Sequence, residues 1–384
     1  MIPISIEIQL PNLPFWQGSQ PAPGGLRTLP FSLGWSENGF VSQTTPTSVR
    51  QEVVEAYATD TYEFITPPPG ASNWASALGD QQISFITKTC RDIEPRSVLE
   101  IGAGSHYVAQ CLLKLLQPQA YTIVDPSVRT EDSRIEVIAD YFPSARLQTR
   151  TFDLVLAFNS LEHVHDPLAF LCGIRASLTP NGIVALCLPD VERQFAAGDL
   201  NALLHEHISY FTQGSLVRLA AAAGLQIAAI SSVDDTLWAI ARASTREVTA
   251  EPPDEILYAA ATNLRRELGR AADEIRRAML AGSVAFHGAT NGLNNFLCLS
   301  GLAGSSQVVV FDGDDLKAGR YLPTCPNPIR SSSDPEYRRF GRVYVSALTY
   351  FEPIRRFACD QHGLAGDAIV PLFAADRCRT VVVR

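Results

Sequence analysis

Two groups of residues in this sequence have the types and spacing needed for ligand binding and proton transfer. The first is Val98-Leu-Glu-Ile-Gly-Ala-Gly-Ser105, an apolar run that enters a glycine turn, with helix-forming sequence behind it at 107–116. Gly102 and Gly104 let the backbone pass close beneath a ligand, because a Cβ there would occupy the space that the ligand needs. One helix and one strand later, Tyr121-Thr-Ile-Val-Asp125 ends in a carboxylate, where the two hydroxyls of a ribose would bind. Together these features predict a nucleoside-binding unit.

The acidic residue in the first run, Glu100, narrows the choice of ligand. A carboxylate is unexpected beside the phosphates of a dinucleotide, which already carry negative charge. It suits a cationic ligand with an amine and a ribose, and we predict S-adenosylmethionine as the cofactor. Asn159 ends a later strand beside the expected methionine end of that cofactor, so we expect a contact there. Asp140 could face the adenine amine or serve as an ordinary turn residue.

The second group is His205-Glu-His-Ile-Ser-Tyr-Phe-Thr212, between a strand and a helix, at the edge where open α/β sheets bind ligands. His-x-His spacing is not the i, i+4 pairing of a helical zinc site, so we predict no metal. A general base with a carboxylate partner suits the pattern better, because a carboxylate orients the imidazole and stabilises its charged form. The same residues could instead satisfy loop backbone groups and cap a helix at Thr212.

Composition excludes several classes of function. The chain has 384 residues and a net charge of −9, which disfavours nucleic acid and anionic membranes as partners. No apolar run approaches the ~20 residues of a membrane span, and the N-terminus has no basic segment typical of a signal peptide. The eight cysteines are scattered without a CxxC pair, so neither a zinc knuckle nor a disulfide framework is indicated. We therefore expect a cytoplasmic protein that acts on a small molecule, and the oligomeric state stays open.

The order of patterns along the chain predicts four segments. Residues 1–75 are rich in proline and glycine and are expected to be a loop-rich arm, packed on the next domain or covering the active site with Tyr62. Residues 76–245 alternate strands and helices, which predicts a parallel sheet with helices on both faces. Residues 246–281 carry a long amphipathic linker helix, and residues 282–384 begin a second, smaller βα pattern.

Several motifs taken together resemble the nucleotide-sugar C-methyltransferase family. They are Glu-x-Gly-x-Gly with its downstream aspartate, Leu161-Glu-His-Val-His-Asp-Pro167, Leu178-Thr-Pro-Asn-Gly182, the group at 205–211, and Lys317-Ala-Gly-Arg-Tyr-Leu-Pro323. The resemblance runs from about residue 50 to 350. It implies a class I methyltransferase sheet of Rossmann-like α/β type, followed by a second, smaller Rossmann-like domain.

The resemblance also implies a reaction: transfer of a methyl group from S-adenosylmethionine to carbon 3 of a dTDP-4-keto-6-deoxysugar. His207 would be the base and Glu206 its orienting partner, with His205 and Tyr210 nearby. A carbon acid beside a ketone is weakly acidic, so both a base and stabilisation of the enolate are needed. A cluster near a later strand end could hold the diphosphate or be a solvated turn: Lys317, Arg320 and Tyr321.

The chain departs from the family pattern mainly on the substrate side. It lacks the four cysteines of the family's N-terminal zinc site, Leu204 stands where a tyrosine is usual, and Gly292 stands where a lysine is expected. Glu162 and His163 are assigned a structural role at a helix start. We predict C-methylation of a nucleotide sugar, with O- or N-methylation of another metabolite and a catalytically silent scaffold as the alternatives.

Overall fold

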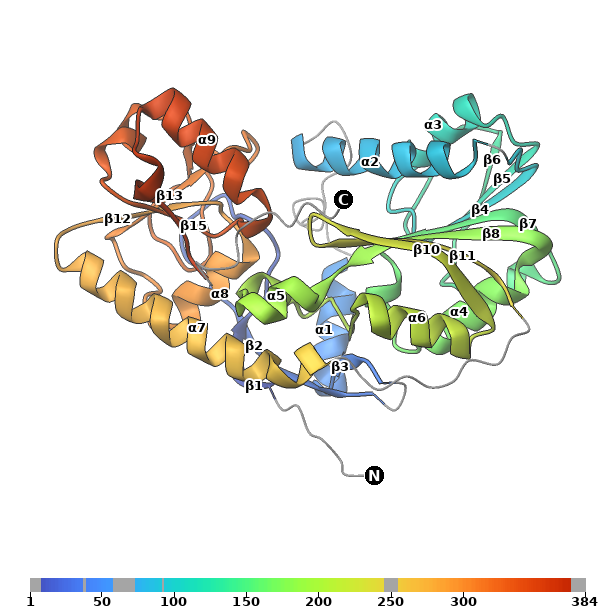
Figure 1. Cartoon of the computed structure of the whole chain (residues 1–384), viewed down its shortest axis with the longest axis horizontal. Coiled ribbons are helices and arrows are strands. Elements are labelled where there is room, and N and C mark those ends of the chain that lie inside the picture. Colours follow the sequence, from blue (N-terminus) through green and yellow to red (C-terminus); the bar gives the residue numbers. More distant parts are fainter. Residues whose placement is uncertain (1–7, 37–38, 58–72, 92, 245–254, 374–384) are drawn as a thin grey trace.

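The computed structural model describes residues 8–36, 39–57, 73–91, 93–244 and 255–373. The chain forms two lobes, with residues 97–243 in the lobe on the right of Figure 1 and residues 255–373 in the lobe on the left. Residues 8–43 lie below and between the lobes. No helix in the described ranges has both the length and the apolar character that crossing a bilayer requires.

The right-hand lobe is built on a seven-stranded sheet, with strands β4 (Ser97–Ile101), β5 (Ala120–Val124), β6 (Ile135–Ile138), β7 (Phe152–Phe158), β8 (Leu178–Pro189), β10 (Leu225–Val233) and β11 (Thr236–Ala243). Their spatial order is β6-β5-β4-β7-β8-β11-β10. All pairings from β6 to β8 are parallel, and β11 is antiparallel to both of its neighbours. The predicted parallel sheet with a final antiparallel pair is therefore present.

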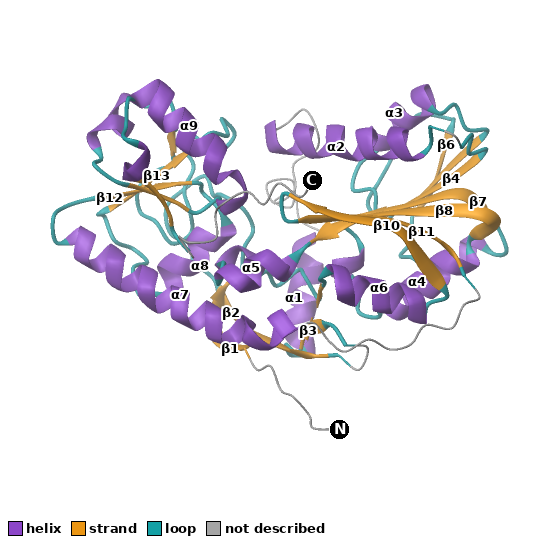
Figure 2. Ribbon diagram, in the orientation of Figure 1, coloured by secondary structure: helices purple, strands orange, loops and turns teal. Residues whose placement is uncertain are grey.

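Helices cover both faces of this sheet. Helices α2 (Asn73–Thr89) and α3 (Tyr107–Leu115) lie above it in Figure 2, and α4 (Pro167–Ala176) and α6 (Gln213–Ala222) lie below it. Leu154, Val155 and Leu156 in the central strand β7 are all fully buried. Because successive residues of a strand point to opposite faces, a continuous apolar run requires cover on both sides.

One expected turn is absent. The sequence suggests a turn at 180–182 that feeds a strand from Ile183, but β8 already begins at Leu178. The pairing of β8 with β7 changes register between Leu178 and Ile183, so a bulge accommodates the extra residues.

The left-hand lobe has a second, entirely parallel sheet. Its spatial order is β14 (Arg330–Ser331), β13 (Val308–Asp312), β12 (Val284–His287), β15 (Val343–Val345) and β16 (Ile369–Pro371). Helices α8 (Asn291–Leu299) and α9 (Phe351–His362) belong to this unit, and α7 (Glu255–Met279) runs along its lower edge (Figure 1). This is the second Rossmann-like unit that the sequence predicts.

The N-terminal region is more regular than the predicted loop-rich arm. Strands β1 (Ile8–Pro14), β2 (Thr28–Trp35) and β3 (Val41–Gln43) form an antiparallel sheet that is completed by β9 (Ser209–Tyr210), and helix α1 (Thr47–Tyr57) follows. The prolines and glycines suggested loops, but the fourth strand of this sheet comes from a segment far along the chain. Such a pairing leaves no signal in the local pattern.

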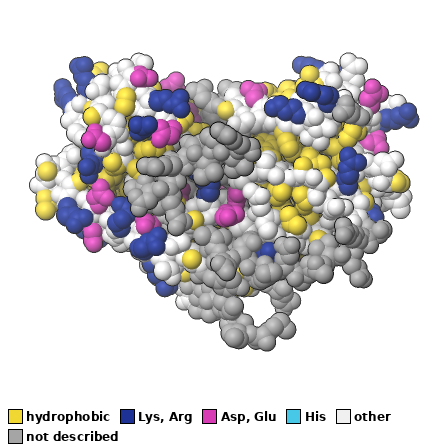
Figure 3. Space-filling view, in the orientation of Figure 1, with side chains coloured by type: hydrophobic (Ala, Val, Ile, Leu, Met, Phe, Trp, Pro, Cys, Tyr) yellow, Lys and Arg dark blue, Asp and Glu magenta, His cyan; other side chains and the backbone are white. Residues whose placement is uncertain are grey.

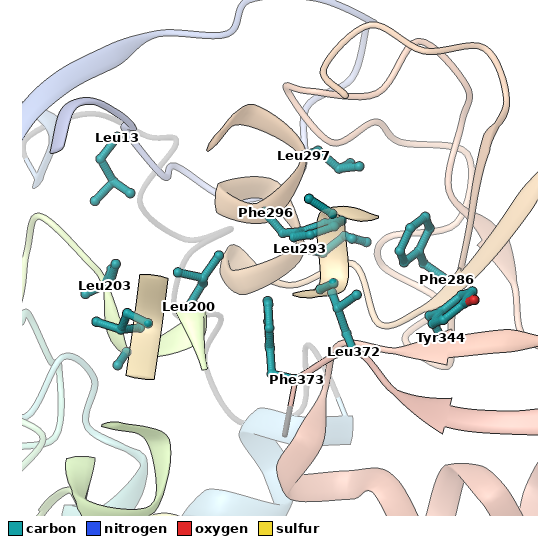
Figure 4. Packing of buried hydrophobic residues seen from close by; sticks show 14 of the residues in the cluster. Leu13, Leu200, Leu203, Phe286, Leu293, Phe296, Leu297, Tyr344, Leu372 and Phe373 are labelled. Atoms are coloured by element: carbon teal, nitrogen blue, oxygen red, sulfur yellow. The ribbon is translucent and has the colours of Figure 1, made fainter. Parts of the chain in front are cut away.

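One hydrophobic core joins the N-terminal sheet to the second lobe. In Figure 4, Leu13 of β1 and Leu200 and Leu203 of the segment after α5 (Val191–Ala197) lie near Leu293 and Phe296 of α8. All of these side chains are at most 2% exposed. The segment that leads to His205 is therefore packed between the two lobes rather than lying on the surface.

Candidate functional site: the carboxyl edge of the first sheet

The glycine turn after β4 is shaped by close contact on one side and open space on the other. Gly102 and Gly104 have φ of +66° and +62°, a region that side chains rarely adopt. A Cβ on Gly102 would lie 2.4 Å from Oγ of Ser160, whereas a Cβ on Gly104 would meet no atom within 4 Å. The turn therefore leaves open space next to Gly104.

Asp125, directly after β5, contacts this turn. Its Oδ2 accepts a hydrogen bond from the backbone N–H of Gly104 at 3.0 Å. Its Oδ1 accepts from the N–H groups of Ser127 and Val128 at 2.7 and 3.0 Å, which fixes the carboxylate. Since each carboxylate oxygen can accept about two hydrogen bonds, Oδ2 can also accept one from a ligand hydroxyl.

Glu100 has a protein partner next to the same turn. It is 4% exposed, and Tyr121 of the neighbouring strand donates to its carboxylate at 2.6 Å. Burial raises the pKa of Glu100 to about 7, although the hydrogen bond from Tyr121 opposes that change. The Glu100 side chain is therefore bound to Tyr121 next to the turn, and its predicted contact with the cofactor stays a prediction.

The two other predicted cofactor residues have different surroundings. Asn159 directly follows β7 with φ of +47°, and its amide nitrogen lies 3.4 Å from Oε1 of Glu162. Asp140 accepts from the Ser144 hydroxyl at 2.6 Å and from the Tyr141 N–H at 2.8 Å, and the Ser144 bond lowers its pKa. These bonds are those of a turn residue, so Asp140 fits the second reading of the sequence.

Three side chains that the sequence did not group together converge beside Asn159. Glu162 and His163 lie in a single turn (η3, Leu161–His163) directly after β7. His207 comes from the loop between β8 and β9, and its ring centroid is 5.0 Å from that of His163. One ligand-type atom from each of the three lies within 4.8 Å of the others. The cluster is next to the glycine turn, because the Ser160 hydroxyl donates to the Ile101 carbonyl at 3.0 Å.

The hydrogen bonds of the cluster define the state of His163. Its Nδ1 lies 3.0 Å from the carbonyl oxygen of Glu206. A carbonyl oxygen can only accept a hydrogen bond, so in neutral His163 the proton is on Nδ1 and the lone pair is on Nε2. Nε2 is 3.8 Å from Oε1 of Glu162. Within the described structure, Oε2 of Glu162 is buried and has no hydrogen-bond partner.

Burial makes all three groups neutral near pH 7. It raises the pKa of Glu162 to about 8 and lowers that of His163 to about 4. It also lowers the pKa of His207 well below the usual value, and His163 adds to that shift. A neutral carboxylic acid can donate a proton or a hydrogen bond, and two neutral imidazoles can accept one.

Two further residues of the predicted histidine group differ in their surroundings. His205 is 5% exposed, and its ring packs edge-on against Phe15 and Phe31 of the N-terminal region, which corrects its predicted place beside the base. Tyr210 is 1% exposed and donates to the Leu204 carbonyl at 3.1 Å. Its ring lies edge-on to that of His207, with the ring centroids 6.3 Å apart, as expected of a residue near the base. The predicted role of the Glu206 side chain as the partner that orients His207 stays a prediction, while the Glu206 backbone carbonyl accepts a hydrogen bond from His163.

Comparison with known proteins matches a part of the chain that contains the glycine turn and the histidine cluster. Residues 76–230 match the family described as a methyltransferase domain. This segment is a methyltransferase domain. The mitochondrial ubiquinone biosynthesis O-methyltransferase of Schizosaccharomyces pombe is 26% identical over 153 residues, which cover 36% of this chain and 55% of that protein. The ubiquinone biosynthesis O-methyltransferase of Histophilus somni is 27% identical over 146 residues, covering 34% of this chain and 60% of its own.

Solved structures are similar to part of this chain. The 1,6-didemethyltoxoflavin-N1-methyltransferase of Burkholderia thailandensis aligns over 56% of this chain and 96% of its own, at 18% identity and a TM-score of 0.38. A S-adenosylmethionine-dependent methyltransferase of Clostridium acetobutylicum aligns over 43% of this chain and 92% of its own, at 9% identity and a TM-score of 0.37. The chain spans little more than half the length of the curated relatives that it matches.

The methyltransferase domain has the predicted class I Rossmann-like fold, since the strand order and the family match agree. The prediction of a methyltransferase that uses S-adenosylmethionine is confirmed for this domain. Its residues would fit that cofactor: the open side of Gly104 would leave room for the nucleoside, and Asp125 would offer an oxygen to the ribose. When bound, the cofactor supplies an electrophilic methyl group on a sulfonium.

The predicted diphosphate residues of the second lobe already have protein partners. Lys317 donates to Oδ2 of Asp312 at 3.0 Å. Arg320 binds the backbone carbonyl of Ser19, and its Nε donates to the Ser19 hydroxyl at 2.9 Å. The backbone of Tyr321 pairs with that of Gln20. The Arg320 side chain and the Tyr321 backbone therefore bind the N-terminal segment to this lobe, and the assignment of Lys317, Arg320 and Tyr321 to the substrate stays a prediction. Tyr62 lies outside the described residues.

Figure 3 shows apolar side chains on the methyltransferase lobe below α2, over β10 and β11, on the side that faces the other lobe.

The cluster of Glu162, His163 and His207 was missed because His207 lies 44 residues after His163 in the sequence. The usable signal was Leu161-Glu-His-Val164 at the end of a predicted strand, because parallel strands bring their carboxyl ends to one edge.

Proposed function

We propose that the protein is a S-adenosylmethionine-dependent methyltransferase that deprotonates a small-molecule acceptor before methylating it. The observation that carries this proposal is the convergence of Glu162, His163 and His207 beside the glycine turn. The methyl group moves from sulfur to a nucleophilic atom of the acceptor, so an acceptor that is a weak acid must lose a proton to react. Groups within reach of that proton supply typically 10²- to 10⁴-fold of rate.

His207 is the proposed base and Glu162 the proposed hydrogen-bond donor. His207 is neutral near pH 7 and so can take the proton directly. Glu162 keeps its proton at that pH, since its pKa is about 8, and its Oε2 has no other partner in the described structure. A buried neutral carboxylic acid is suited to stabilise a developing oxyanion through a hydrogen bond.

A base combined with an oxyanion donor favours a carbon acid beside a carbonyl group. The first candidate acceptor is therefore the keto-deoxysugar of a nucleotide sugar, as the sequence motifs imply. The second candidate is a hydroxyl group of another small molecule, which needs the base alone. It is supported by the O-methyltransferases of ubiquinone biosynthesis that the domain resembles.

Exchange of a substrate hydrogen with solvent tests the two candidates. The protein is incubated in D₂O with 4-keto-6-deoxysugar nucleotides and with S-adenosylhomocysteine in place of the methyl donor. Carbon-acid chemistry predicts deuterium at the carbon next to the ketone, and loss of that exchange in His207→Ala. Methyl transfer to a phenol or alcohol panel, with no exchange on any keto sugar, would establish the second candidate instead.

The same three side chains have the spacing of ligands for a divalent cation. A chelator separates this role from proton transfer. If the cluster handles a proton, methyl transfer is unchanged after treatment with EDTA and dialysis. Loss of activity that zinc or magnesium restores would instead assign Glu162 and both histidines to a metal.

A further inference from the structure

The loop that carries His207 is held in place through its backbone carbonyl oxygens, which accept hydrogen bonds from other parts of the chain. The carbonyls of five consecutive residues, 204 to 208, all accept hydrogen bonds from outside the loop. His163 binds the carbonyl of Glu206 at 3.0 Å. The four others bind Gln43: its Nε2 lies 2.9, 2.9 and 2.6 Å from the carbonyl oxygens of residues 204, 205 and 207, and its backbone N–H donates to that of residue 208 at 2.8 Å.

Gln43 reaches the loop from the N-terminal sheet. It is the last residue of β3, is 5% exposed, and follows two residues that pair with β9. Its own carbonyl accepts a hydrogen bond from Arg50 at 3.2 Å. The backbone of Gln43 is therefore held by the pairing of β3 with β9 and by Arg50.

We propose that Gln43 is a positioning residue, which holds the loop 204–208 so that His207 stays against His163 and Glu162. This role rests on the proposed function, and it makes the N-terminal sheet part of the active site. One amide NH₂ group has two hydrogens, so three carbonyl oxygens share them. No other uncharged side chain of similar length offers two such donors from one atom.

The other end of the segment is anchored separately. Asn291 and Asn295 of α8 donate to the carbonyl of Leu203 at 2.8 and 3.0 Å. Loss of the Gln43 side chain therefore leaves residues up to 203 anchored and removes the hydrogen bonds to the carbonyls of residues 204, 205 and 207, next to and at His207. A displacement of about 1 Å in a catalytic group can cost on the order of 10²-fold in rate.

Three variants test the proposal. Gln43→Met keeps the length of the side chain and removes both donors. Gln43→Glu replaces the donor by an oxygen that repels the three carbonyls when ionised and donates one hydrogen bond when protonated. The matched control is Asn263→Leu, since Asn263 is 8% exposed and also donates from a buried amide to a backbone carbonyl, that of Phe195 at 3.2 Å.

Each variant is measured for kcat, for KM of S-adenosylmethionine, for melting temperature and for the NMR resonances of His207. Gln43→Met is expected to lower kcat about 10- to 100-fold with KM for the cofactor unchanged, and to shift the titration of His207 toward that of an ordinary histidine. Asn263→Leu is expected to lower the melting temperature with kcat nearly unchanged. For Gln43→Glu, kcat relative to wild type should rise as pH falls.

Equal losses of kcat in Gln43→Met and Asn263→Leu at equal loss of melting temperature would overturn the proposal. If Gln43→Met does not fold, the pH dependence of Gln43→Glu decides, and a ratio to wild type that is flat with pH overturns it. The NMR arm needs no turnover. If wild type transfers no methyl group, the proposed function fails, while an altered His207 titration in Gln43→Met still supports the positioning role and an unaltered one overturns it.

Discussion

In the methyltransferase domain, Asp125 at the end of β5 accepts a hydrogen bond from Gly104 in the turn after β4, at 3.0 Å. In the second unit, Asp312 at the end of β13 accepts one from Ala289 in the turn after β12, at 2.7 Å. The second oxygen of each carboxylate accepts an N–H two residues further on, from Ser127 and from Asp314. The two units thus repeat one arrangement of strand, turn, helix, strand and carboxylate.

The units differ in what occupies the space beside the turn. A Cβ on Gly104 would meet no atom of the described residues within 4 Å, whereas one on Gly292, in the first turn of α8 that follows the second turn, would lie 2.4 to 2.6 Å from the side chain of Asn201. Asn201 belongs to the segment after α5, and its Oδ1 accepts from the Gly292 N–H at 2.8 Å. Its Nδ2 donates to the Ser346 carbonyl at 2.9 Å, across the second sheet.

The charge beside the carboxylate differs as well. Lys317 lies 3.0 Å from Asp312 and neutralises it, while Asp125 binds only N–H and hydroxyl donors in the described structure. The same fold element therefore suits the predicted ligand site where its turn is open and its carboxylate has spare acceptor capacity. It serves as a docking face for the other lobe where protein fills the turn.

One histidine from each unit gives the largest expected difference, although the two do not occupy equivalent positions. His207→Ala should lower kcat about 10²- to 10⁴-fold with binding of S-adenosylhomocysteine nearly normal, because the base is lost and the nucleoside site is intact. His287, at the end of β12, bonds to the Tyr337 hydroxyl at 2.8 Å. His287→Ala should lower the melting temperature and leave kcat within a few-fold of wild type, as measured by methyl transfer at saturating substrates. Full turnover in His207→Ala would remove the base from the proposed function.

The two carboxylates offer a matched pair for cofactor binding. Asp125→Asn should weaken binding of S-adenosylhomocysteine about 10- to 100-fold in calorimetry, since a charged hydrogen bond to the ligand contributes roughly 1.5–3 kcal/mol. Asp312→Asn should leave that affinity unchanged and destabilise the fold by about 2–4 kcal/mol, because Lys317 loses its partner. A loss of cofactor affinity in Asp312→Asn equal to that in Asp125→Asn would refute the assignment of different roles.

The filled turn can be tested by adding one methyl group. Gly292→Ala should destabilise the protein by about 1–3 kcal/mol in denaturant unfolding, since the new Cβ would overlap Asn201 and force the lobes apart. The control is Gly269→Ala, in the middle of α7, where a Cβ meets nothing within 4 Å. That change should be neutral or stabilise by about 0.5–1 kcal/mol, because alanine is the better helix former. Equal effects of both changes would mean that Asn201 is not a tight contact.

The first unit could be predicted from sequence because its signals are local. The strand, the glycines around 102 and the carboxylate at 125 lie within 30 residues, and their order fixes their geometry. The second unit could be predicted as a fold for the same reason. The residue that packs against this unit could not be predicted, because Asn201 lies 91 residues before Gly292 in the sequence. An asparagine in a loop does not indicate which residue it will contact.

The cluster of Glu162, His163 and His207 and the N-terminal sheet were not predicted from the sequence, for a related reason. Glu162-His163 reads as a helix start, and its meeting with His207 depends on which strands are neighbours in the sheet. Gln43 reads as one polar residue in a proline-rich arm. Its four bonds to the loop appear only when β3 and β9 pair, and that pairing carries no local pattern.

Titration of one buried carboxyl group in each unit gives the smallest expected effect on the stability of the fold. The two groups change stability with pH in opposite directions. Burial raises the pKa of Glu162 to about 8, so its protonated form stabilises the fold below the ordinary pKa near 4.5, and this contribution is lost as pH rises toward 8. For Asp312, burial alone would raise the pKa, but Lys317 and the N–H donors outweigh it and lower the pKa. Its contribution is present above pH 3.8 and is lost as pH falls below that value.

The melting temperature measured from pH 5 to 9 separates the two carboxyls. Glu162→Gln keeps the neutral shape and cannot ionise, so its melting temperature should fall less than that of wild type as pH rises, by roughly 2–5 °C at pH 9. Asp312→Asn should run parallel to wild type across this range and differ in shape only in acid. If Glu162→Gln instead runs parallel to wild type up to pH 9, Glu162 is already ionised at pH 5. The cluster beside the glycine turn would then hold a fixed negative charge, which favours a bound cation over a proton donor.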